Sequence, residues 1–479
     1  METIPVLIGG ELVHARSGET IDAVNPATGE TIGRVPRCSA ADTDDAVRAA
    51  ARAQPEWRAL DPLDRARTVG RIADAVLEHA EELAALDVID NGSPIREMRR
   101  DAGIAAGQLR YFAGLALQLR GDTIPTSHDR LNYTLHQPFG VVGRIIPFNH
   151  PLMFAAGRLG APLIAGNTVI MKPSEHTSLS ALRLGELIRE VVPPGVVNVI
   201  TGYGSETGDA LVAHPEVRRI AFIGSVPVGR AIQRRAAEHA VKTVTLELGG
   251  KNPIVVFEDA DLDAAVSGAV RGMNFTWQGQ SCGSTSRLLV HSSRHAELVA
   301  RLAERLDAMQ SGPPDQEATE TGAIVNRGQF DKVIDYVRIG REEGARLVAG
   351  GNALTGGPFA RGLFVRPALF DDVRPESRLA QEEIFGPVLA AMPFTTYDEA
   401  LSIANGVSYG LSASVFTRDL GTAHRFARDV QAGYVWVNDA SAHFPGTDFG
   451  GVKDSGVGRE EGFQELLSYT QSKNVNVRF

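Results

Sequence analysis

The amino-acid sequence predicts an α/β protein with two parallel-sheet domains, and three observations lead to this prediction. The chain has 479 residues, and because a single hydrophobic core stops growing at roughly 250–300 residues, at least two domains are expected. Apolar residues make up 43% and charged residues 22% of the chain, as in ordinary globular proteins. Short apolar runs alternate with stretches of helical periodicity in two successive series, which is typical of βαβ units.

The N-terminal part is expected to form a β layer followed by helices. Up to residue 37, apolar residues alternate with turn formers, which is a hairpin pattern. These turn formers are Gly9-Gly10, Asn25-Pro26 and Gly29. From residue 41 to about residue 118, apolar residues recur at helical spacing, which predicts amphipathic helices. We expect the β layer to cover the core and the helices to pack on a sheet that comes later.

A first series of apolar runs predicts that sheet. The runs cover residues 141–147, 168–171, 196–201, 219–223 and 243–246. Helical stretches separate the runs, so the strands should be parallel and covered on both faces. Sheets of this kind bind ligands beyond the carboxyl ends of their strands. The functional residues are therefore expected directly after these runs.

A second α/β series follows a boundary near Gly249-Gly250. Its strands are expected near residues 254–257, 286–290, 364–369 and 413–416. Two further apolar-polar strands, 131–136 and 473–479, lie outside both series. They could form a projecting arm used in oligomerisation, and edge strands tucked against the core are an equal alternative.

Charge and cysteine content exclude several classes of protein. A formal net charge of -10 argues against nucleic acid as the main partner, because phosphate contacts need concentrated Lys and Arg. The two cysteines exclude a disulfide framework and a multi-cysteine metal site, and they fit a reducing compartment. The start of the chain lacks a basic segment followed by an apolar run, and no stretch of about 18 apolar residues occurs. We expect a cytoplasmic, non-membrane protein without a metal.

Cys282 and Glu247 are the first candidates for chemistry. Cys282 ends the segment Gly279-Gln280-Ser281-Cys282 between a helical stretch and a strand, and a turn there can expose its thiol. A lone cysteine is more often a small buried residue, so the other residues of the site determine whether Cys282 is interpreted as a nucleophile. Glu247 stands between two leucines at a strand end, where burial should raise its pKa and suit it to accept a proton. An ion-paired glutamate at a strand end is an equally good interpretation.

Asn149 is the third candidate. It lies in Pro147-Phe148-Asn149-His150-Pro151, directly after the first strand of the parallel sheet, and Pro151 is well placed to begin a helix. The amide of Asn149 can donate a hydrogen bond to a developing oxyanion. Taken alone, an Asn before a helix is more simply explained as a cap.

Two further segments suggest a dinucleotide. Phe222-Ile223-Gly224-Ser225 runs from a strand into a helix, and Gly229 follows, so backbone N–H groups at a helix start could face a phosphate. Lys172 and Glu175 follow the neighbouring strand and could hold ribose hydroxyls. A simple salt bridge between them is the alternative.

Together these five segments, in this order, resemble the aldehyde dehydrogenase superfamily over nearly the whole chain. Further similar stretches are 382–387, 409–412, 449–456 and 458–460. The resemblance implies a Rossmann-like NAD-binding domain from residues 1–122 and 140–248 and a second α/β catalytic domain, 249–445. It also implies a small β oligomerisation arm from residues 123–139 and 460–479.

The resemblance also implies roles for individual residues. Cys282 would be the nucleophile and Glu247 the general base, while Asn149 and the Cys282 backbone N–H would form the oxyanion hole. Lys172 and Glu460 are further catalytic candidates, and Arg158 and Glu460 match positions where relatives pass protons onward from the base. The residues assigned to NAD are Ile146, Lys172, Ser174, Glu175, Gly204, Gly208, Phe222, Gly224, Ser225, Gly229, Leu248, Glu383 and Phe385.

The chain departs from the commonest family pattern around the expected substrate tunnel. Phe148 replaces the usual Trp and Ile223 the usual Thr. The residues expected to line the tunnel are His150, Phe154, Trp277, Ser281, Phe444 and Phe449. Their aromatic character favours a ring-bearing aldehyde, although aromatic residues also fill cores and aromatic faces also bind quaternary ammonium groups.

The resemblance implies that the chain oxidises an aldehyde to the acid through a thiohemiacetal and a thioester on Cys282. Retention of Glu247 favours hydrolysis of the thioester over transfer to coenzyme A, since CoA-acylating relatives often lack this carboxylate. Glu175 should repel a 2′-phosphate, so NAD should be used better than NADP. The alternatives are a CoA-acylating enzyme and a non-catalytic structural protein on the same fold. The expected partners are the aldehyde and other copies of the chain in a homodimer or homotetramer.

Overall fold

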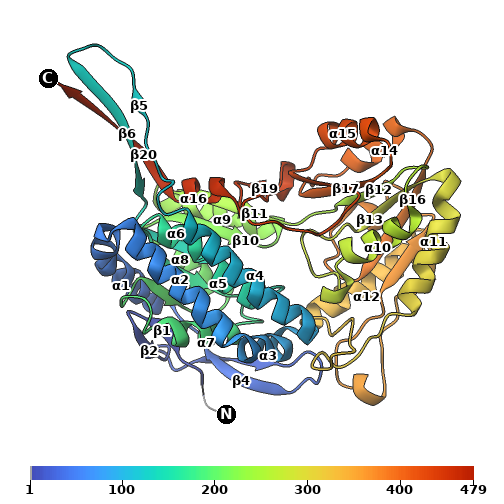
Figure 1. Ribbon diagram of the computed structural model, residues 1–479. Coiled ribbons are helices and arrows are strands. Elements are labelled where there is room, and N and C mark those ends of the chain that lie inside the picture. Colours follow the sequence, from blue (N-terminus) through green and yellow to red (C-terminus); the bar gives the residue numbers. More distant parts are fainter. Residues whose placement is uncertain (1–2) are drawn as a thin grey trace.

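The computed structural model describes residues 3–479, and their strands form four sheets, of which two dominate the molecule (Figure 1). The larger sheet contains, in spatial order, β19 (Gly456–Val457), β11 (Thr243–Glu247), β10 (Val217–Ile223), β7 (Val141–Ile145), β8 (Thr168–Lys172), β9 (Val197–Val199), β1 (Val6–Ile8) and β2 (Glu11–Val13). Its five central strands, from β11 to β9, are parallel. The expected first βαβ series is confirmed.

The N-terminal segment differs from the expected covering layer. β1 pairs antiparallel with β9 and extends the large sheet at its edge, because Val6 and Leu7 are buried in the same core as the parallel strands. β3 (Thr20–Val24) and β4 (Thr31–Pro36) form a separate antiparallel pair. Only this pair behaves as a layer outside the main sheet.

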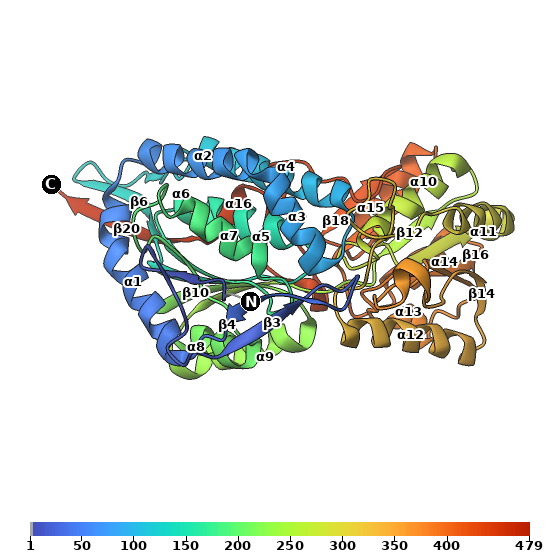
Figure 2. The same cartoon turned by 90° about the horizontal axis from the view of Figure 1, so that it is seen from below.

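Helices cover both faces of the larger sheet, and those expected between residues 41 and 118 are confirmed. The helices of this first α/β unit are α1 (Ala40–Ala59), α2 (Pro62–Glu78), α3 (Ala80–Asn91), α4 (Ile95–Gly114), α5 (Pro151–Gly157), α6 (Gly160–Ile164), α7 (Leu179–Ile188), α8 (Asp209–Ala213) and α9 (Val226–His239). Figure 2 shows α2, α4, α5 and α7 on one side of this sheet and α8 and α9 on the other. A short π-helical turn, η1 (Gly204–Gly208), precedes α8.

The second α/β series forms the other large sheet. In spatial order its strands are β14 (Arg346–Ala349), β15 (Ala368–Asp371), β16 (Val388–Phe394), β13 (Arg287–His291), β12 (Pro253–Val256), β17 (Ser412–Phe416) and β18 (Tyr434–Val437). All pairs are parallel except that of β14 with β15. The sequence analysis missed β14, β16 and β18. It also predicted that β15 begins at residue 364. The strand begins only at Ala368, because Pro367 has no N–H to donate to the ladder.

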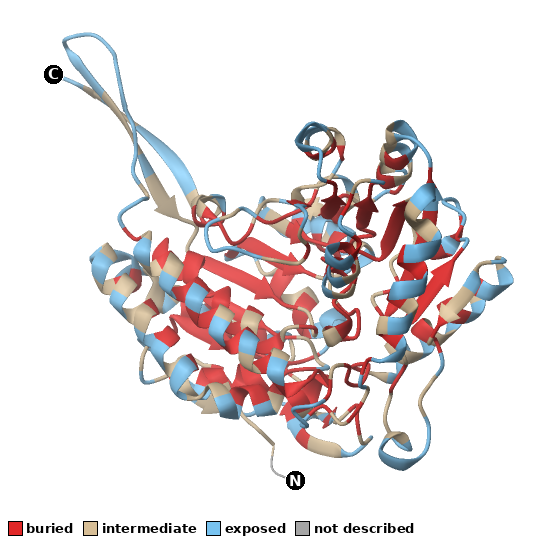
Figure 3. Ribbon diagram, turned by 45° about the vertical axis from the view of Figure 1, so that its right-hand side comes forward, coloured by how far each residue is buried: buried red, intermediate tan, exposed pale blue. Residues whose placement is uncertain are grey.

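Helices and buried apolar clusters lie on both faces of this second sheet. The helical elements are α10 (Leu262–Gly272), η2 (Phe275–Trp277), α11 (Ser292–Asp307), α12 (Arg327–Glu342), η3 (Gly357–Phe359), α13 (Arg378–Gln381), α14 (Tyr397–Asn405), α15 (Leu420–Asp429) and η4 (Lys453–Ser455). Figure 3 shows the strands of both large sheets buried and the outward sides of their helices exposed. In the part of the chain that the structure describes, no helix is long and apolar enough to cross a membrane.

A β arm projects from the body of the molecule (Figure 1). It is an antiparallel sheet of β20 (Thr470–Arg478), β6 (Arg130–Pro138) and β5 (Thr123–Ile124). The rest of the C-terminal segment expected in the arm contains α16 (Phe463–Ser468), whose Leu466 is buried with Tyr469 in the core of the larger sheet. Only β20 of the segment 460–479 therefore projects.

Candidate active site

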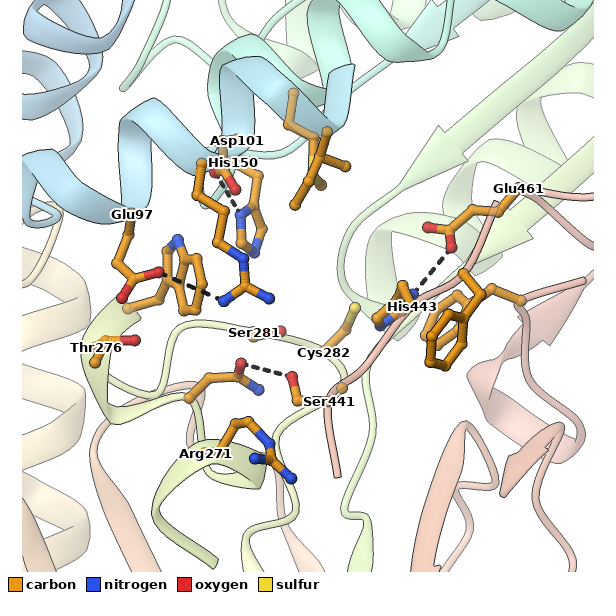
Figure 4. A pocket seen from close by; sticks show the side chains of 18 of the residues that line it. Glu97, Asp101, His150, Arg271, Thr276, Ser281, Cys282, Ser441, His443 and Glu461 are labelled. Atoms are coloured by element: carbon orange, nitrogen blue, oxygen red, sulfur yellow. Dashed lines mark hydrogen bonds and ion pairs between the residues drawn. The ribbon is translucent and has the colours of Figure 1, made fainter. Parts of the chain in front are cut away.

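A cavity of about 1090 Å³ receives residues from both α/β units. Glu247 reaches it from the end of β11, and Cys282 reaches it from the turn before β13. One face of α4 forms another wall, and the segment 441–449 closes a further side. Figure 4 shows Glu97, Asp101 and His150 on the α4 side, with Ser281, Cys282 and His443 across the cavity from them.

The turn that carries Cys282 is held by hydrogen bonds from outside it. Asn252 donates its side-chain N–H to the Cys282 carbonyl at 2.7 Å and to the Ser284 carbonyl at 3.0 Å. The thiol is half-buried. Burial, followed by the nearby carboxylates of Glu383 and Glu247, raises the pKa of Cys282 to about 12. In this environment the thiol keeps its proton until a base removes it.

Glu247 is a buried carboxylate without a partner. Its residue is 5% exposed, and within residues 3–479 neither carboxylate oxygen has a hydrogen-bond partner. Burial and the nearby Glu460 raise its pKa well above the usual range, against the weaker attraction of Arg158 and Arg459. The expectation that burial raises the pKa of Glu247 is confirmed, and the ion-paired alternative is not observed among the described residues. A carboxylate with a raised pKa is suited to accept a proton.

Asn149 follows β7 and is buried, at 3% exposed. The N-cap of α5 is His150, and α5 begins at Pro151 as expected, so Asn149 is not the cap of this helix. Its side-chain oxygen has no hydrogen-bond partner among the described residues. Asn149 does not line the cavity itself, although the adjoining His150 does.

The start of α9 is an open helix N-terminus. Ser225 is its N-cap, and the Ser225 side chain makes no cap hydrogen bond. Gly229 packs against Leu248, so closely that a Cβ at residue 229 would lie 2.8 Å from a Leu248 methyl carbon. Backbone N–H groups in a first helical turn are ready donors to a phosphate. The geometry fits a phosphate group of a dinucleotide at this end of β10.

Lys172 and Glu175 form the salt bridge that the sequence left open as an alternative. The Lys172 Nζ donates to the Pro173 carbonyl at 2.9 Å and to the Glu175 carboxylate at 3.4 Å. Burial lowers the pKa of Lys172. Gly208 of η1 lies beside the Lys172 stem, since a Cβ on Gly208 would be 3.8 Å from Lys172 Cδ. Two predicted cofactor segments therefore meet at the end of β8.

Glu383 approaches Cys282 from the second α/β unit, and Phe385 follows it two residues later. The Gly250 N–H donates to the Glu383 carboxylate at 3.0 Å, and burial raises the pKa of Glu383. Phe385 has a left-handed backbone, with φ of 58°, and its ring lies 5.5 Å from that of Phe148. An uncommon backbone conformation of a bulky residue marks a position that its surroundings impose.

All the residues expected to line the substrate tunnel reach the same cavity. They are His150, Phe154, Trp277, Ser281, Phe444 and Phe449. The His150 ring lies 5.6 Å from that of Phe154 and 5.4 Å from that of Trp277. Aromatic side chains thus surround the approach to the thiol.

Behind Glu247 lies a buried cluster of arginines and glutamates. The Arg158 guanidinium lies 3.2 Å from Glu460, 3.0 Å from Glu461 and 3.6 Å from Glu465. Arg144 contacts Glu460 at 2.5 Å. The predicted pair Arg158 and Glu460 is therefore assembled, and both residues line the cavity with Glu247.

Comparison with known proteins decides the family. The sequence profile of the aldehyde dehydrogenase family matches residues 12–475. The chain belongs to the aldehyde dehydrogenase family. Aldehyde dehydrogenase tropH of Talaromyces stipitatus is 45% identical over 463 residues, which are 95% of this chain and 90% of that relative.

Solved aldehyde dehydrogenases share the whole fold. The NAD+ complex of aldehyde dehydrogenase from Bacillus cereus superposes with a TM-score of 0.97 at 40% identity, over 100% of this chain and 97% of that one. The indole-3-acetaldehyde dehydrogenase AldA of P. syringae, a mutant in complex with NAD+ and IAA, gives 0.97 at 39% identity, over 99% and 97%.

Sequence reasoning missed two carboxylates that hold imidazoles in this aldehyde dehydrogenase. Asp101 contacts His150 Nδ1 at 2.8 Å, and Glu461 contacts His443 Nδ1 at 2.9 Å. It also missed Arg100, which lies on the cavity face of α4. The helical periodicity of α4 could have placed Arg100 and Asp101 on one face, but no sequence signal shows which other elements that face meets.

Proposed function

We propose that this chain oxidises an aldehyde to the carboxylic acid with NAD+ as the hydride acceptor, through intermediates on Cys282. The observation that carries the proposal is one cavity that holds both a cysteine thiol and a buried, unpartnered carboxylate, Glu247. A nucleophile and a base of raised pKa are the two groups that acyl chemistry on a thiol requires.

The residues expected to hold NAD+ fit a dinucleotide. The uncapped start of α9 offers backbone N–H groups for the pyrophosphate, and Lys172 with Glu175 offers a cation and a carboxylate for the adenosine ribose. Glu383, close to Cys282, and Phe385 would hold the nicotinamide riboside. The NAD+ complexes of the relatives support NAD+ as the cofactor. When bound, NAD+ accepts the hydride that the aldehyde carbon loses.

In the first half of the reaction Cys282 makes the covalent bond. The thiol loses its proton to Glu247, directly or through water, and the thiolate adds to the aldehyde carbon to give a thiohemiacetal. The Asn149 amide and the Cys282 backbone N–H donate hydrogen bonds to the developing oxyanion. Departure of the hydride leaves the acyl group as a thioester on Cys282.

In the second half Glu247 activates water. Its carboxylate first releases the thiol proton towards Glu460 and then accepts a proton from a water molecule, whose oxygen adds to the thioester carbon. Collapse of that adduct breaks the carbon–sulfur bond, releases the carboxylic acid and returns the thiolate. Glu460 and Arg158 lie behind Glu247 and offer a route for the proton to leave the site. The aromatic cavity wall favours a ring-bearing aldehyde.

The experiment mixes protein, NAD+ and a panel of aliphatic and aromatic aldehydes and follows NADH. We expect NADH and free carboxylic acid, no change of product when coenzyme A is added, and a higher kcat/KM with NAD+ than with NADP+ because Glu175 repels a 2′-phosphate. Cys282→Ala should abolish NADH formation, and Cys38→Ala, at the fully buried second cysteine, should retain it. If no aldehyde of the panel yields NADH, a non-catalytic structural protein is favoured.

The arm supports assembly as a homodimer or homotetramer. It exposes large apolar side chains at Ile124, Leu131, Leu135 and Phe479, and unpaired edge strands invite pairing with another chain. Light scattering measures the assembly, and a monomer at micromolar concentration would exclude this part of the proposal.

A further inference from the structure

Five arginines line the cavity, and four of them are occupied by carboxylates. Those four are Arg158, Arg271, Arg301 and Arg305. Arg301, for example, lies 2.8 Å from Asp263 and 2.5 Å from Glu297. Paired guanidiniums have little charge or hydrogen-bonding capacity left for a ligand.

Arg100 is different. Within residues 3–479 it makes no hydrogen bond, and its nearest carboxylate, Glu97, is 3.9 Å away. At this separation the ion pair with Glu97 is weak, although the attraction of Arg100 acts against the burial that raises the pKa of Glu97. The Arg100 side chain is 57% exposed. It therefore offers the cavity a positive charge whose N–H donors are unused.

The neighbours of Arg100 hold it in the cavity without using those donors. Its guanidinium carbon lies 5.9 Å from the centre of the Trp277 ring, and a cation–π contact uses the face of the guanidinium while the N–H groups point outward in its plane. Asp101, the next residue of α4, is engaged by His150 at 2.8 Å. The carboxylate beside Arg100 in sequence is thus not available to neutralise it.

The wall of α4 around Arg100 leaves room for a substrate. Gly103 and Gly107 line the cavity on the same helix, and a Cβ at either position would meet nothing within 4 Å. Ser281 and Cys282 lie across the cavity from the α4 residues labelled in Figure 4. A molecule that spans this space would have one end at the thiol and the other at Arg100.

We infer that the substrate is an aldehyde with a carboxylate at the end remote from its carbonyl group, and that Arg100 binds this carboxylate. The inference rests on the proposed function and names its substrate class. The two oxygens of a carboxylate match the fork of one guanidinium. A phosphate would bring a second charge, for which this part of the cavity offers no further unpaired arginine among the described residues.

The experiment compares matched aldehydes with the full-length protein and NAD+. One rigid pair is 4-carboxybenzaldehyde and 4-methylbenzaldehyde, and one flexible pair is 6-oxohexanoate and hexanal. The readout is the ratio of kcat/KM for the carboxylated aldehyde to that for its neutral partner, measured for the native protein, Arg100→Gln, Arg100→Lys and Arg301→Gln. Arg301→Gln is the matched control, because it removes an arginine of the same cavity that is already paired.

We expect the native ratio to exceed 1 for at least one pair. A charge-assisted hydrogen bond predicts that Arg100→Gln lowers the ratio about 10- to 100-fold. Arg100→Lys should restore part of it, and Arg301→Gln should leave it unchanged. A native ratio of 1 or less for both pairs, or a preference that survives Arg100→Gln, would overturn the inference while the proposed oxidation stands. If no aldehyde of either pair yields NADH, the inference is overturned as well, and activity on the wider panel then decides separately whether the proposed function fails.

Discussion

Two buried carboxylates in the wall of the same cavity, Glu247 and Glu461, have opposite surroundings. Glu247 ends a strand of the larger sheet and has no hydrogen-bond partner among the described residues. Glu461 contacts Arg158 at 3.0 Å and His443 at 2.9 Å. Burial raises the pKa of Glu247 well above its usual range, whereas the charges of His443 and Arg158 outweigh burial and lower the pKa of Glu461 to about 2.

The difference shows that charged and hydrogen-bonding partners, rather than burial alone, determine whether a buried carboxyl stays ionised or can act as a base. Glu461 stays ionised and holds other side chains in place. It also has a left-handed backbone, with φ of 70°, a conformation that persists only when the surroundings impose it. Glu247 holds its proton more tightly than an ordinary carboxyl and can act as a base, at the cost of a polar group buried without a hydrogen-bond partner among the described residues.

The largest expected effect tests Glu247 as the base. Glu247→Gln should lower kcat by about 10²–10⁴, the usual contribution of a general base. The Gln variant can neither accept the thiol proton nor activate water, so both halves of the reaction should slow. Rapid mixing measures the first half as the rate at which the first NADH per active site forms, and the second half as the steady rate that follows.

The same experiment has a clear control and a clear failure. Cys282→Ala should give neither a burst nor turnover, because no acyl group can be held. Full turnover by Glu247→Gln would refute its role as the base. A fast first turnover followed by slow steady turnover would place Glu247 in the second half of the reaction alone.

The next prediction compares the stability of the two Gln variants. Glu461→Gln breaks a buried ion pair and should lower the free energy of unfolding by roughly 3–5 kcal/mol. Glu247→Gln removes an uncompensated buried charge and should raise it by roughly 0.5–2 kcal/mol. Denaturant unfolding near neutral pH measures both. Two changes of the same sign would contradict the comparison.

The pH dependence of stability follows with a definite sign. The folded-state pKa of Glu461 is lowered from 4.5 to about 2, so its stabilising contribution is present above about pH 4.5 and is lost as the pH falls towards 2. The raised pKa of Glu247 acts in the opposite direction, because its ionisation costs stability as the pH rises above the unfolded value.

The smallest expected effect is the slope of activity with pH. The reaction needs Glu247 without its proton, because this carboxylate accepts the proton of the Cys282 thiol, and burial and Glu460 raise the pKa of Glu247. Below that pKa kcat/KM should rise about tenfold per pH unit, for this one deprotonation. Glu460 and Glu461 act to keep Glu247 protonated, while Arg158 and Arg459 act against them. A profile that is flat from about pH 6 to 9 would contradict this prediction.

The sequence predicted those features that depend on local pattern. Apolar runs with helical stretches between them predicted the parallel strands β7, β8, β10 and β11. In β7, β8 and most of β10 the run is buried on both faces and is therefore largely apolar, whereas β11 is buried only at its carboxyl end. It missed β14 and β18 at the two edges of the second sheet and β16 inside it, and it placed β1 in a separate layer. Strand pairing is a long-range contact with no local signature.

The sequence by itself also determined which chemical groups are present, since a thiol at Cys282 and a carboxylate between leucines at Glu247 can be read directly. Only the tertiary structure decided their states. Among the described residues Glu247 has no hydrogen-bond partner and Glu461 contacts Arg158 and His443, because of which elements meet behind β11. Arg100 makes no hydrogen bond among these residues, because its nearest carboxylate, Glu97, lies 3.9 Å away. Burial and ion pairing depend on contacts with residues that are distant in the sequence. The pKa of a side chain is therefore set only when the fold brings those residues together.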